Sequence, residues 1–249
     1  MTDTATTLGF LYPGYAAEDD YPRMATLLSN SISIELVHTS VGEDAHRIDA
    51  LLDLGGAERL EAGTRELMER GATAIVWACT SGSFVFGWEG ARRQVAALQR
   101  VSERPASSTS FAFVNALRAL GITRVSIAAT YPEDVANAFA KFLAAAGIET
   151  LATGAEDIIT ATEVGTFGRE RVLGMVEAAS SGPAEAVLVP DTALHTVAWV
   201  DEIEGVARKP VLTANQVTMF EALRLADALE RQDGLGTLFR EFDPRFAAA

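Results

Sequence analysis

The sequence predicts an α/β protein built from two pseudo-symmetric, Rossmann-like lobes with parallel sheets. Short β-branched or aromatic runs alternate along its 249 residues with longer segments of helical periodicity. This alternation is typical of parallel strands joined by crossover helices. A second observation is an internal similarity. Residues 74–81 and 186–193 each place an apolar strand before a side chain that can carry a proton, followed by Thr.

Seven segments have the composition of strands, being short, apolar and rich in β-branched or aromatic residues. We expect strands at Leu8–Tyr12, Ile32–His38, Thr73–Ala78, Arg124–Ala129, Gly147–Leu151, Ala186–Val189 and Pro210–Thr213.

Helical periodicity falls between these strands. We expect helices at Glu58–Arg70, Trp88–Val101, Pro132–Ala146, Glu163–Ser180 and Gln216–Gln232. Pro132 suits a first helical turn. Gly71, Gly121 and Gly147 each follow a helical stretch and precede a strand, as glycines that end helices do.

The internal similarity assigns one proton-bearing residue to each lobe. We expect residues 1–115 with 215–249 to form the lobe that carries Cys79, and residues 116–214 to form the lobe that carries Asp191. A looser similarity relates Phe10–Pro13 to Ala129–Pro132, since each is a strand end followed by Tyr-Pro. Because open α/β sheets bind ligands at the carboxyl ends of their strands, the active site is expected in the cleft between the lobes.

The charge and the cysteine content exclude several classes of binding partner and metal site. The formal net charge of -14 repels phosphate backbones and anionic lipid, so nucleic acid and membrane surfaces are not expected partners. One cysteine allows no internal disulfide and no cysteine-rich metal site. The first residues lack a basic start and an apolar run, and no apolar stretch approaches the ~20 residues that span a bilayer, so we expect a cytoplasmic protein.

Cys79 is the first candidate for catalysis. It follows an apolar strand and precedes a polar turn that contains Thr80, Ser81 and Gly82. Backbone N–H groups and hydroxyls in such a turn bind anions, and a nearby helix dipole favours a thiolate. The alternative is a packing role, because free cysteine is among the most buried residue types. The polar end of a strand favours the catalytic interpretation.

Asp191 occupies the corresponding strand end of the second lobe. Partial burial would raise the pKa of its carboxyl group and suit a general acid or base. The alternative is a helix N-cap, because a helix-compatible run follows it. His195 could orient Asp191, although a capping or exposed role is more ordinary. His38 and His46 lack metal-ligand spacing, so we expect no metal site.

Loop residues complete the expected site. Tyr131 follows a predicted strand, where it would either donate a phenolic hydrogen bond into the cleft or pack on its rim. Pro13 and Gly14 follow the first strand and are expected to line the entrance. Three aromatic residues form either an apolar wall or part of the core: Phe84, Phe86 and Trp88. The segment 82–87 has neither the Lys of a P-loop nor the spacing of a dinucleotide fingerprint, so ATP and NAD are not implied.

Segments along nearly the whole chain carry a family resemblance. The strongest are Cys79–Ser81, Val114–Gly121, Arg124–Val125, Ala129–Tyr131, Asp134–Val135, Leu188–Thr196, Pro210–Val211 and Ala222–Ala226. At these residues the sequence resembles the aspartate/glutamate racemase superfamily, in the branch of arylmalonate decarboxylase and maleate cis-trans isomerase.

This resemblance implies an enzyme without a cofactor, with its active site between two similar halves. Racemases and maleate isomerase in the family use one cysteine from each half, whereas arylmalonate decarboxylase keeps only the second and has glycine at the first. Here Cys79 matches the first position and Asp191 stands at the second. By the same match, Thr80, Ser81, Tyr131 and the backbone N–H of Thr192 would bind a carboxylate and stabilise its enediolate.

Three functions remain open. A cofactor-independent isomerase of a small carboxylic acid, either a racemase or a maleate-type cis-trans isomerase, is preferred because the retained thiol stands where maleate isomerase has its nucleophile. The alternatives are a decarboxylase of a substituted malonate with protonation by Cys79, and an inactive carboxylate-binding protein. A small carboxylate is the expected partner, and a homo-oligomer is compatible with the sequence.

Overall fold

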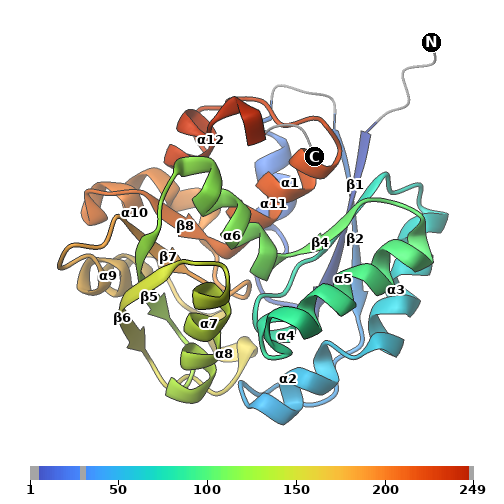
Figure 1. The fold of residues 1–249 in the computed structure, drawn as a ribbon, viewed down its shortest axis with the longest axis horizontal. Coiled ribbons are helices and arrows are strands. Elements are labelled where there is room, and N and C mark those ends of the chain that lie inside the picture. Colours follow the sequence, from blue (N-terminus) through green and yellow to red (C-terminus); the bar gives the residue numbers. More distant parts are fainter. Residues whose placement is uncertain (1–5, 29–31, 247–249) are drawn as a thin grey trace.

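The computed structural model describes residues 6–28 and 32–246, and it confirms the predicted α/β class (Figure 1). Two four-stranded sheets have the same spatial order, β2-β1-β3-β4 and β6-β5-β7-β8, and all neighbouring strands are parallel. The strands are β1 (Thr6–Pro13), β2 (Ile32–Thr39), β3 (Ala74–Trp77), β4 (Ala106–Ser108), β5 (Arg124–Ala129), β6 (Glu149–Ala155), β7 (Ala186–Val189) and β8 (Val211–Thr213).

Helices connect the strands and cover the sheets. They are α1 (Asp20–Ala25), α2 (Ile48–Leu54), α3 (Ala57–Glu69), α4 (Ser81–Phe84), α5 (Gly87–Ser102), α6 (Thr109–Leu120), α7 (Glu133–Ala145), α8 (Ala161–Val164), α9 (Arg169–Ala179), α10 (Val200–Ala207), α11 (Ala214–Leu225) and α12 (Gly236–Glu241). Two short 3₁₀ helices lie at Val197–Trp199 and Pro244–Phe246. No helix among the described residues combines the length and the apolar composition needed to cross a membrane.

All seven predicted strands are present. The two similarities found in the sequence, of residues 74–81 with 186–193 and of Phe10–Pro13 with Ala129–Pro132, each relate strands in equivalent positions. β3 and β7 are each the third strand of their sheet in chain order, and β1 and β5 are each the first. The sequence analysis missed β4, because three small residues after a proline carry no strand pattern. It also ended β6 too early, since this edge strand is largely exposed and lacks an apolar run.

The predicted helices are confirmed with three corrections. The segment predicted at Glu163–Ser180 is two helices, because Gly165 and Gly168 interrupt it between α8 and α9. Pro132 is the N-cap of α7 rather than part of its first turn. α11 ends at Leu225, seven residues before the predicted end. The three glycines predicted to end helices have positive φ angles of 82°, 68° and 81°, as expected for Gly71, Gly121 and Gly147.

The core has three parts that follow the layers. The central part fills the space between the inner faces of both sheets and includes most of α6 and α11, which lie between the sheets in Figure 1. The outer face of the first sheet packs on α3 and α5, and the outer face of the second packs on α9 and α10.

Side-chain caps begin both central helices directly after the fourth strand of each sheet. The Ser108 hydroxyl accepts the Phe111 N–H at the start of α6, and Thr213 forms a reciprocal capping box with Gln216 at the start of α11. The first sheet uses strands from residues 6–108 and the second uses strands from residues 124–213. The exact lobe boundaries at 115 and 215 stay a prediction.

Candidate active site

A pocket of about 350 Å³ lies where the carboxyl ends of strands from both sheets meet. Its lining includes five of the predicted site residues and the predicted second proton carrier: Pro13, Gly14, Cys79, Ser81, Thr192 and Asp191. The structure therefore brings the thiol and the carboxylate to one cavity. Most of the remaining wall is apolar and consists of Tyr12, Tyr15, Ala16, Val41, Ala45, Leu51, Leu54, Ala161 and Ala193.

Cys79 lies on the floor of this pocket. Its side chain is 3% exposed, and its sulfur accepts the Gly82 N–H at 3.3 Å and lies 3.8 Å from the Ser81 hydroxyl. Burial raises the pKa of the Cys79 thiol to about 12, against the lowering effect of these hydrogen bonds, and the negative charge of Asp191 raises it further. The group is therefore a protonated thiol near neutral pH, which suits a proton donor.

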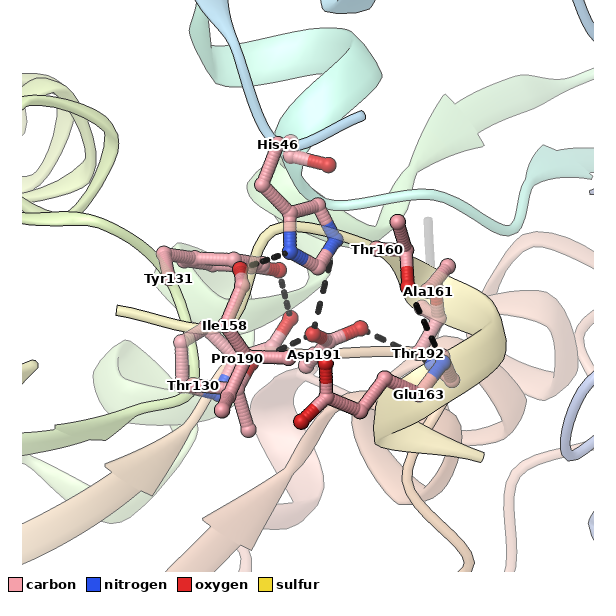
Figure 2. A network of polar contacts seen from close by, with 12 residues as sticks. His46, Thr130, Tyr131, Ile158, Thr160, Ala161, Glu163, Pro190, Asp191 and Thr192 are labelled. Carbon is pink, nitrogen blue, oxygen red and sulfur yellow. Dashed lines mark hydrogen bonds and ion pairs between the residues drawn. The ribbon is translucent and has the colours of Figure 1, made fainter. Parts of the chain in front are cut away.

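Asp191 is held in a tight turn rather than at a helix terminus. Its Oδ1 atom accepts the Ala193 N–H at 3.0 Å, and its Oδ2 atom accepts the Thr130 hydroxyl at 2.5 Å (Figure 2). The Asp191 carbonyl accepts the Leu194 N–H, which closes the turn. The N-cap alternative is wrong, because no helix begins here and the next regular element is the 3₁₀ helix at Val197.

His46 faces Asp191 from the opposite lobe. Its Nε2 atom lies 3.8 Å from Asp191 Oδ2, and its Nδ1 atom lies 2.9 Å from the Ile158 carbonyl oxygen (Figure 2). His195, the histidine that the sequence offered as a partner for Asp191, instead pairs with Asp19 at 2.8 Å. The histidine beside the carboxylate is thus 145 residues away in the chain rather than four.

The loop that carries His46 connects the two lobes over the pocket. We call residues Ser40–Arg47, between β2 and α2, the strap. The strap residue Asp44 accepts the backbone N–H groups of Ala161 and Thr162 and the Thr162 hydroxyl. Burial opposes ionisation of Asp44, but these hydrogen bonds outweigh it and hold the pKa of the carboxyl group below its ordinary value. The strap therefore binds the start of α8 through an ionised side chain.

Two predicted site residues lie behind the pocket wall. Thr80 and Tyr131 are fully buried and are absent from the lining. The Tyr131 hydroxyl donates to the Pro190 carbonyl at 3.0 Å, and its ring packs against His46 and Phe84. The expectation that Tyr131 donates into the cleft therefore differs from the structure, because the ring is anchored in the core. Burial also raises the pKa of this phenol well above its ordinary value.

The segment after Asp191 is anchored by α1, β1 and α11. The Thr192 carbonyl accepts the Tyr12 hydroxyl at 2.8 Å and the Asn215 side-chain amide at 3.2 Å. Buried Asp20 accepts the same amide and the Thr196 N–H. Burial raises the pKa of Asp20 despite these hydrogen bonds. These contacts fix the position of the turn that carries Asp191.

Of the two alternatives for Phe84, Phe86 and Trp88, the structure supports packing in the core, for Phe84 and Trp88, rather than an apolar wall of the pocket. Phe84 packs in the core against Tyr131 and Phe139, Trp88 packs against Phe111 and Phe142, and neither Phe86 nor these two residues line the pocket. The reason is that two helices follow Cys79: α4 carries Phe84, and Phe86 and Trp88 lie at the start of α5.

Among residues 6–28 and 32–246, no group of three or more His, Cys, Asp and Glu side chains has a geometry that could hold a metal ion. His38 instead stacks on Tyr15 and lies 3.4 Å from Glu18.

Sequence reasoning missed the strap and His46. It dismissed His46 as a metal ligand and assigned it no other role. The available signal was its position shortly after the second strand, since loops that follow parallel strands lie at the same edge of a sheet.

Comparison with known proteins gives concordant results. Residues 54–239 match the model of the arylmalonate decarboxylase family. The arylmalonate decarboxylase of Bordetella bronchiseptica is 29% identical over 184 residues, which cover 71% of this chain and 75% of that protein.

Solved structures show the same fold. The maleate isomerase of Pseudomonas putida S16 has a TM-score of 0.86 at 19% identity, covering 95% of this chain and 98% of that one. A maleate cis-trans isomerase of Nocardia farcinica has a TM-score of 0.86 at 21% identity, covering 96% and 100%. An arylmalonate decarboxylase variant that gains one cysteine and loses another has a TM-score of 0.85 at 23% identity, covering 96% and 100%. Since the family model matches well over half of the chain, this protein belongs to the arylmalonate decarboxylase family.

Proposed function

We propose that this protein decarboxylates a malonate that carries an apolar substituent, without a cofactor, and that Cys79 protonates the product carbanion. The observation that carries the proposal is a buried thiol that lines a largely apolar pocket, and burial raises the pKa of that thiol to about 12, so that it keeps its proton. The bond between the α-carbon and one carboxylate breaks, and its electron pair forms an enediolate with the other carboxylate. The Cys79 proton then goes to the α-carbon, CO₂ leaves, and the thiolate regains a proton from water.

The composition of the wall supports loss of CO₂. Transferring a carboxylate from water to apolar surroundings is costly, whereas CO₂ carries no charge. Apolar residues such as Val41, Leu51 and Leu54 therefore disfavour the substrate carboxylate more than the product. The same wall offers room for an aryl or alkyl substituent. The retained carboxylate needs polar donors, for which Ser81 in the lining and the backbone near Thr192 are the candidates.

The presence of one thiol also favours the decarboxylase over a maleate-type isomerase. In the Nocardia farcinica isomerase, a variant with one cysteine replaced by serine holds a covalently bound succinylcysteine intermediate. This chain has a single cysteine throughout. Decarboxylation needs one proton donor and no α-proton base, so Cys79 alone suffices. We therefore prefer the decarboxylase to the isomerase that the sequence alone suggested.

An isomerase is the second candidate, and the position of Asp191 favours it. Asp191 and Cys79 line the same pocket from different sheets, as a two-base racemase requires. The carboxylate would remove the α-proton on one face and the thiol would supply a proton on the other. For a maleate-type substrate, the thiol would add to the double bond and later leave.

Reaction in deuterated water separates these functions. Phenylmalonate and alkylmalonates should release CO₂ and give products with one deuterium at the α-carbon. Exchange or inversion of 2-arylpropionates or amino acids without CO₂ would instead support a racemase, and conversion of maleate would support the cis-trans isomerase. Binding of these acids without any reaction would support a carboxylate-binding protein.

The Asp191→Asn variant sharpens this test. If Cys79 is the sole proton donor, CO₂ release should fall by less than about tenfold, because the neutral side chain keeps the turn. If Asp191 is a base, exchange should fall by about 10²–10⁴-fold, the usual contribution of an acid or base. Proton exchange and CO₂ release are measured on the same preparation.

A further inference from the structure

His46 and Asp191 form a buried pair. The contacts of the two ring nitrogens of His46 indicate which of them carries a proton. Both side chains are about 5% exposed, and their facing atoms, Nε2 and Oδ2, lie 3.8 Å apart. This distance is longer than a hydrogen bond but within the range of an ion pair. Figure 2 shows the His46 ring between Ile158 and Asp191, with one nitrogen directed at each.

The Ile158 contact fixes one ring proton. A carbonyl oxygen only accepts hydrogen bonds, so the Nδ1 atom that lies 2.9 Å from it must carry a proton. A neutral His46 would then present the lone pair of Nε2 to Asp191 Oδ2. An ionised carboxylate at that place would meet a second lone pair in a buried site. One further proton, held by Nε2, removes this repulsion, because the ring then faces the carboxylate as a cation.

The charge of the pocket gives that proton a function. Among the described residues that line the pocket, three carry carboxyl groups: Glu43, Asp44 and Asp191. Of the lining residues within 6–28 and 32–246, His46 alone has a side chain able to carry a positive charge. Arg47 lies next to the pocket, but Glu43 and Asp49 bind its guanidinium group. Without a proton on the His46–Asp191 pair, a carboxylate ligand would enter a pocket with uncompensated negative charge.

We propose that His46 is a positioning residue that keeps one proton on the His46–Asp191 pair, and that this proton allows the pocket to accept a carboxylate. The proposal deepens the function proposed above and rests on it only in taking a carboxylate as the ligand. The pair has no net charge when it holds the second proton and one negative charge when it has lost it. Carboxylate binding is therefore linked to the protonation of the pair.

Other groups that face the pair do not titrate in the same range. Burial raises the pKa of Cys79 to about 12 and those of Tyr12 and Tyr131 well above their ordinary values, so all three stay neutral between about pH 6 and pH 9. The pKa of Asp44 is held low, so that carboxylate stays ionised over the same range. A pH dependence of binding in this interval would thus report on the pair.

A direct test follows the histidine rings by ¹⁵N NMR. The protein has three histidines, and the His46→Gln variant identifies the His46 signals. We expect the parent protein to keep His46 as an imidazolium to a higher pH than the Asp191→Asn variant does. In the variant, the neutral ring should carry its proton on Nδ1. Identical titration of His46 in both proteins would overturn the proposal.

Binding of phenylacetate tests the functional part. Phenylacetate has one carboxyl group, so loss of CO₂ from it cannot form an enediolate. It is fully ionised from about pH 6 to pH 9. In the parent protein, its Kd should rise by up to about tenfold per pH unit once the pair loses its proton. Protein fluorescence or a titration followed by NMR gives Kd at each pH.

Two variants separate the charge of His46 from its role in holding the strap. In His46→Asn the amide can keep the Ile158 hydrogen bond but does not reach Asp191, whereas in His46→Gln it reaches Asp191 without a titratable proton. Both variants should bind phenylacetate weakly and with the same Kd at every pH. His195→Gln is the matched control, because it removes a histidine–carboxylate pair outside the pocket lining and should keep the parent pH dependence.

The outcomes are distinguishable. If His46→Asn keeps the affinity and pH dependence of the parent, His46 only holds the strap and the proposal is wrong. A pH dependence that persists in both variants assigns the proton to another group and equally overturns it. If phenylacetate does not bind the parent at any pH, the carboxylate pocket of the proposed function fails. The NMR titration then still decides whether the pair holds the proton.

Discussion

The ends of β3 and β7 occupy equivalent positions in the two sheets but place their reactive groups in different surroundings. Both strands have four residues and are fully buried, and two residues later they present Cys79 and Asp191 to one pocket. After β3 the chain enters α4 and its thiol becomes desolvated. After β7 the chain makes a turn, and the carboxylate receives a hydroxyl, a backbone N–H and a facing imidazole.

This difference shows that the fold sets where a reactive group lies, whereas the local contacts set what it does. A thiol with few donors keeps its proton and can give it to a carbanion. A carboxylate with several donors is held in one orientation, and here it faces an imidazole that can carry a compensating proton. Equivalent positions in similar lobes therefore need not perform equivalent chemistry.

Replacement of the thiol should have the largest effect. We expect Cys79→Ser to lower CO₂ release by about 10²–10⁴-fold, because a hydroxyl is a much weaker acid than a thiol. The Gly82 N–H can still donate to the serine oxygen, so the melting temperature should change little. An unaltered rate would remove the thiol from the mechanism and leave the β7 end as the source of the proton.

Reaction with iodoacetamide measures the state of the thiol directly. The thiolate is the reactive form, and burial raises the pKa of Cys79 to about 12 from an ordinary value of 9.0. At neutral pH the rate should be roughly a thousandfold below that of an unperturbed thiol. It should rise about tenfold per pH unit up to about pH 11. If the reaction rate instead levels off near pH 9, the Cys79 thiol is not desolvated, and the surroundings of the two strand ends differ less than the structure indicates.

Removing one hydrogen-bond donor beside each reactive group compares how much the contacts at the two strand ends contribute to the free energy of unfolding. Thr130→Val keeps the side-chain shape but takes the hydroxyl from Asp191, and we expect it to lower the free energy of unfolding by about 1–3 kcal/mol. Ser81→Ala is the matched change beside Cys79, where the contact is long at 3.8 Å, and it should cost less than about 1 kcal/mol. Urea denaturation measures both, and equal losses would contradict the comparison.

The strap should show the smallest effect. Asp44→Asn keeps one acceptor for the start of α8, so the free energy of unfolding should fall by about 0.5–1 kcal/mol. The pKa of Asp44 is lowered in the folded state, so its contribution is present above the unfolded value of 3.8 and is lost as pH falls below it. Parent and variant should therefore converge in acid. A constant difference across this range would show that the charge of Asp44 is not what holds the strap.

The sequence predicted most of the architecture because that information is local. Apolar runs and helix-ending glycines revealed seven strands and the main helices, and the similarity between residues 74–81 and 186–193 identified both strand ends of the pocket. The prediction from sequence failed at β4 and at the end of β6, where small or exposed residues carry no periodic pattern.

The partners of the reactive groups were not predictable, because they come from distant segments. His46 reaches Asp191 across 145 residues, and the chain spacing that pointed to His195 had no bearing on which ring meets the carboxylate. Tyr131 was placed in the right region, but its hydroxyl bonds to Pro190 at the end of the neighbouring strand β7, and its ring packs against His46 and Phe84 of the other lobe. Such contacts follow from the tertiary structure.

The central helices have a consequence for how the molecule unfolds. Every residue of α11 except Arg224 is buried, and the Thr218 hydroxyl lies 2.6 Å from the Thr109 hydroxyl of α6. Separation of this helix pair would expose the parts of both sheets that α6 and α11 cover in the central core. Heat or denaturant should therefore melt both halves in a single cooperative transition, and fragments that each carry one sheet should fold only after they associate.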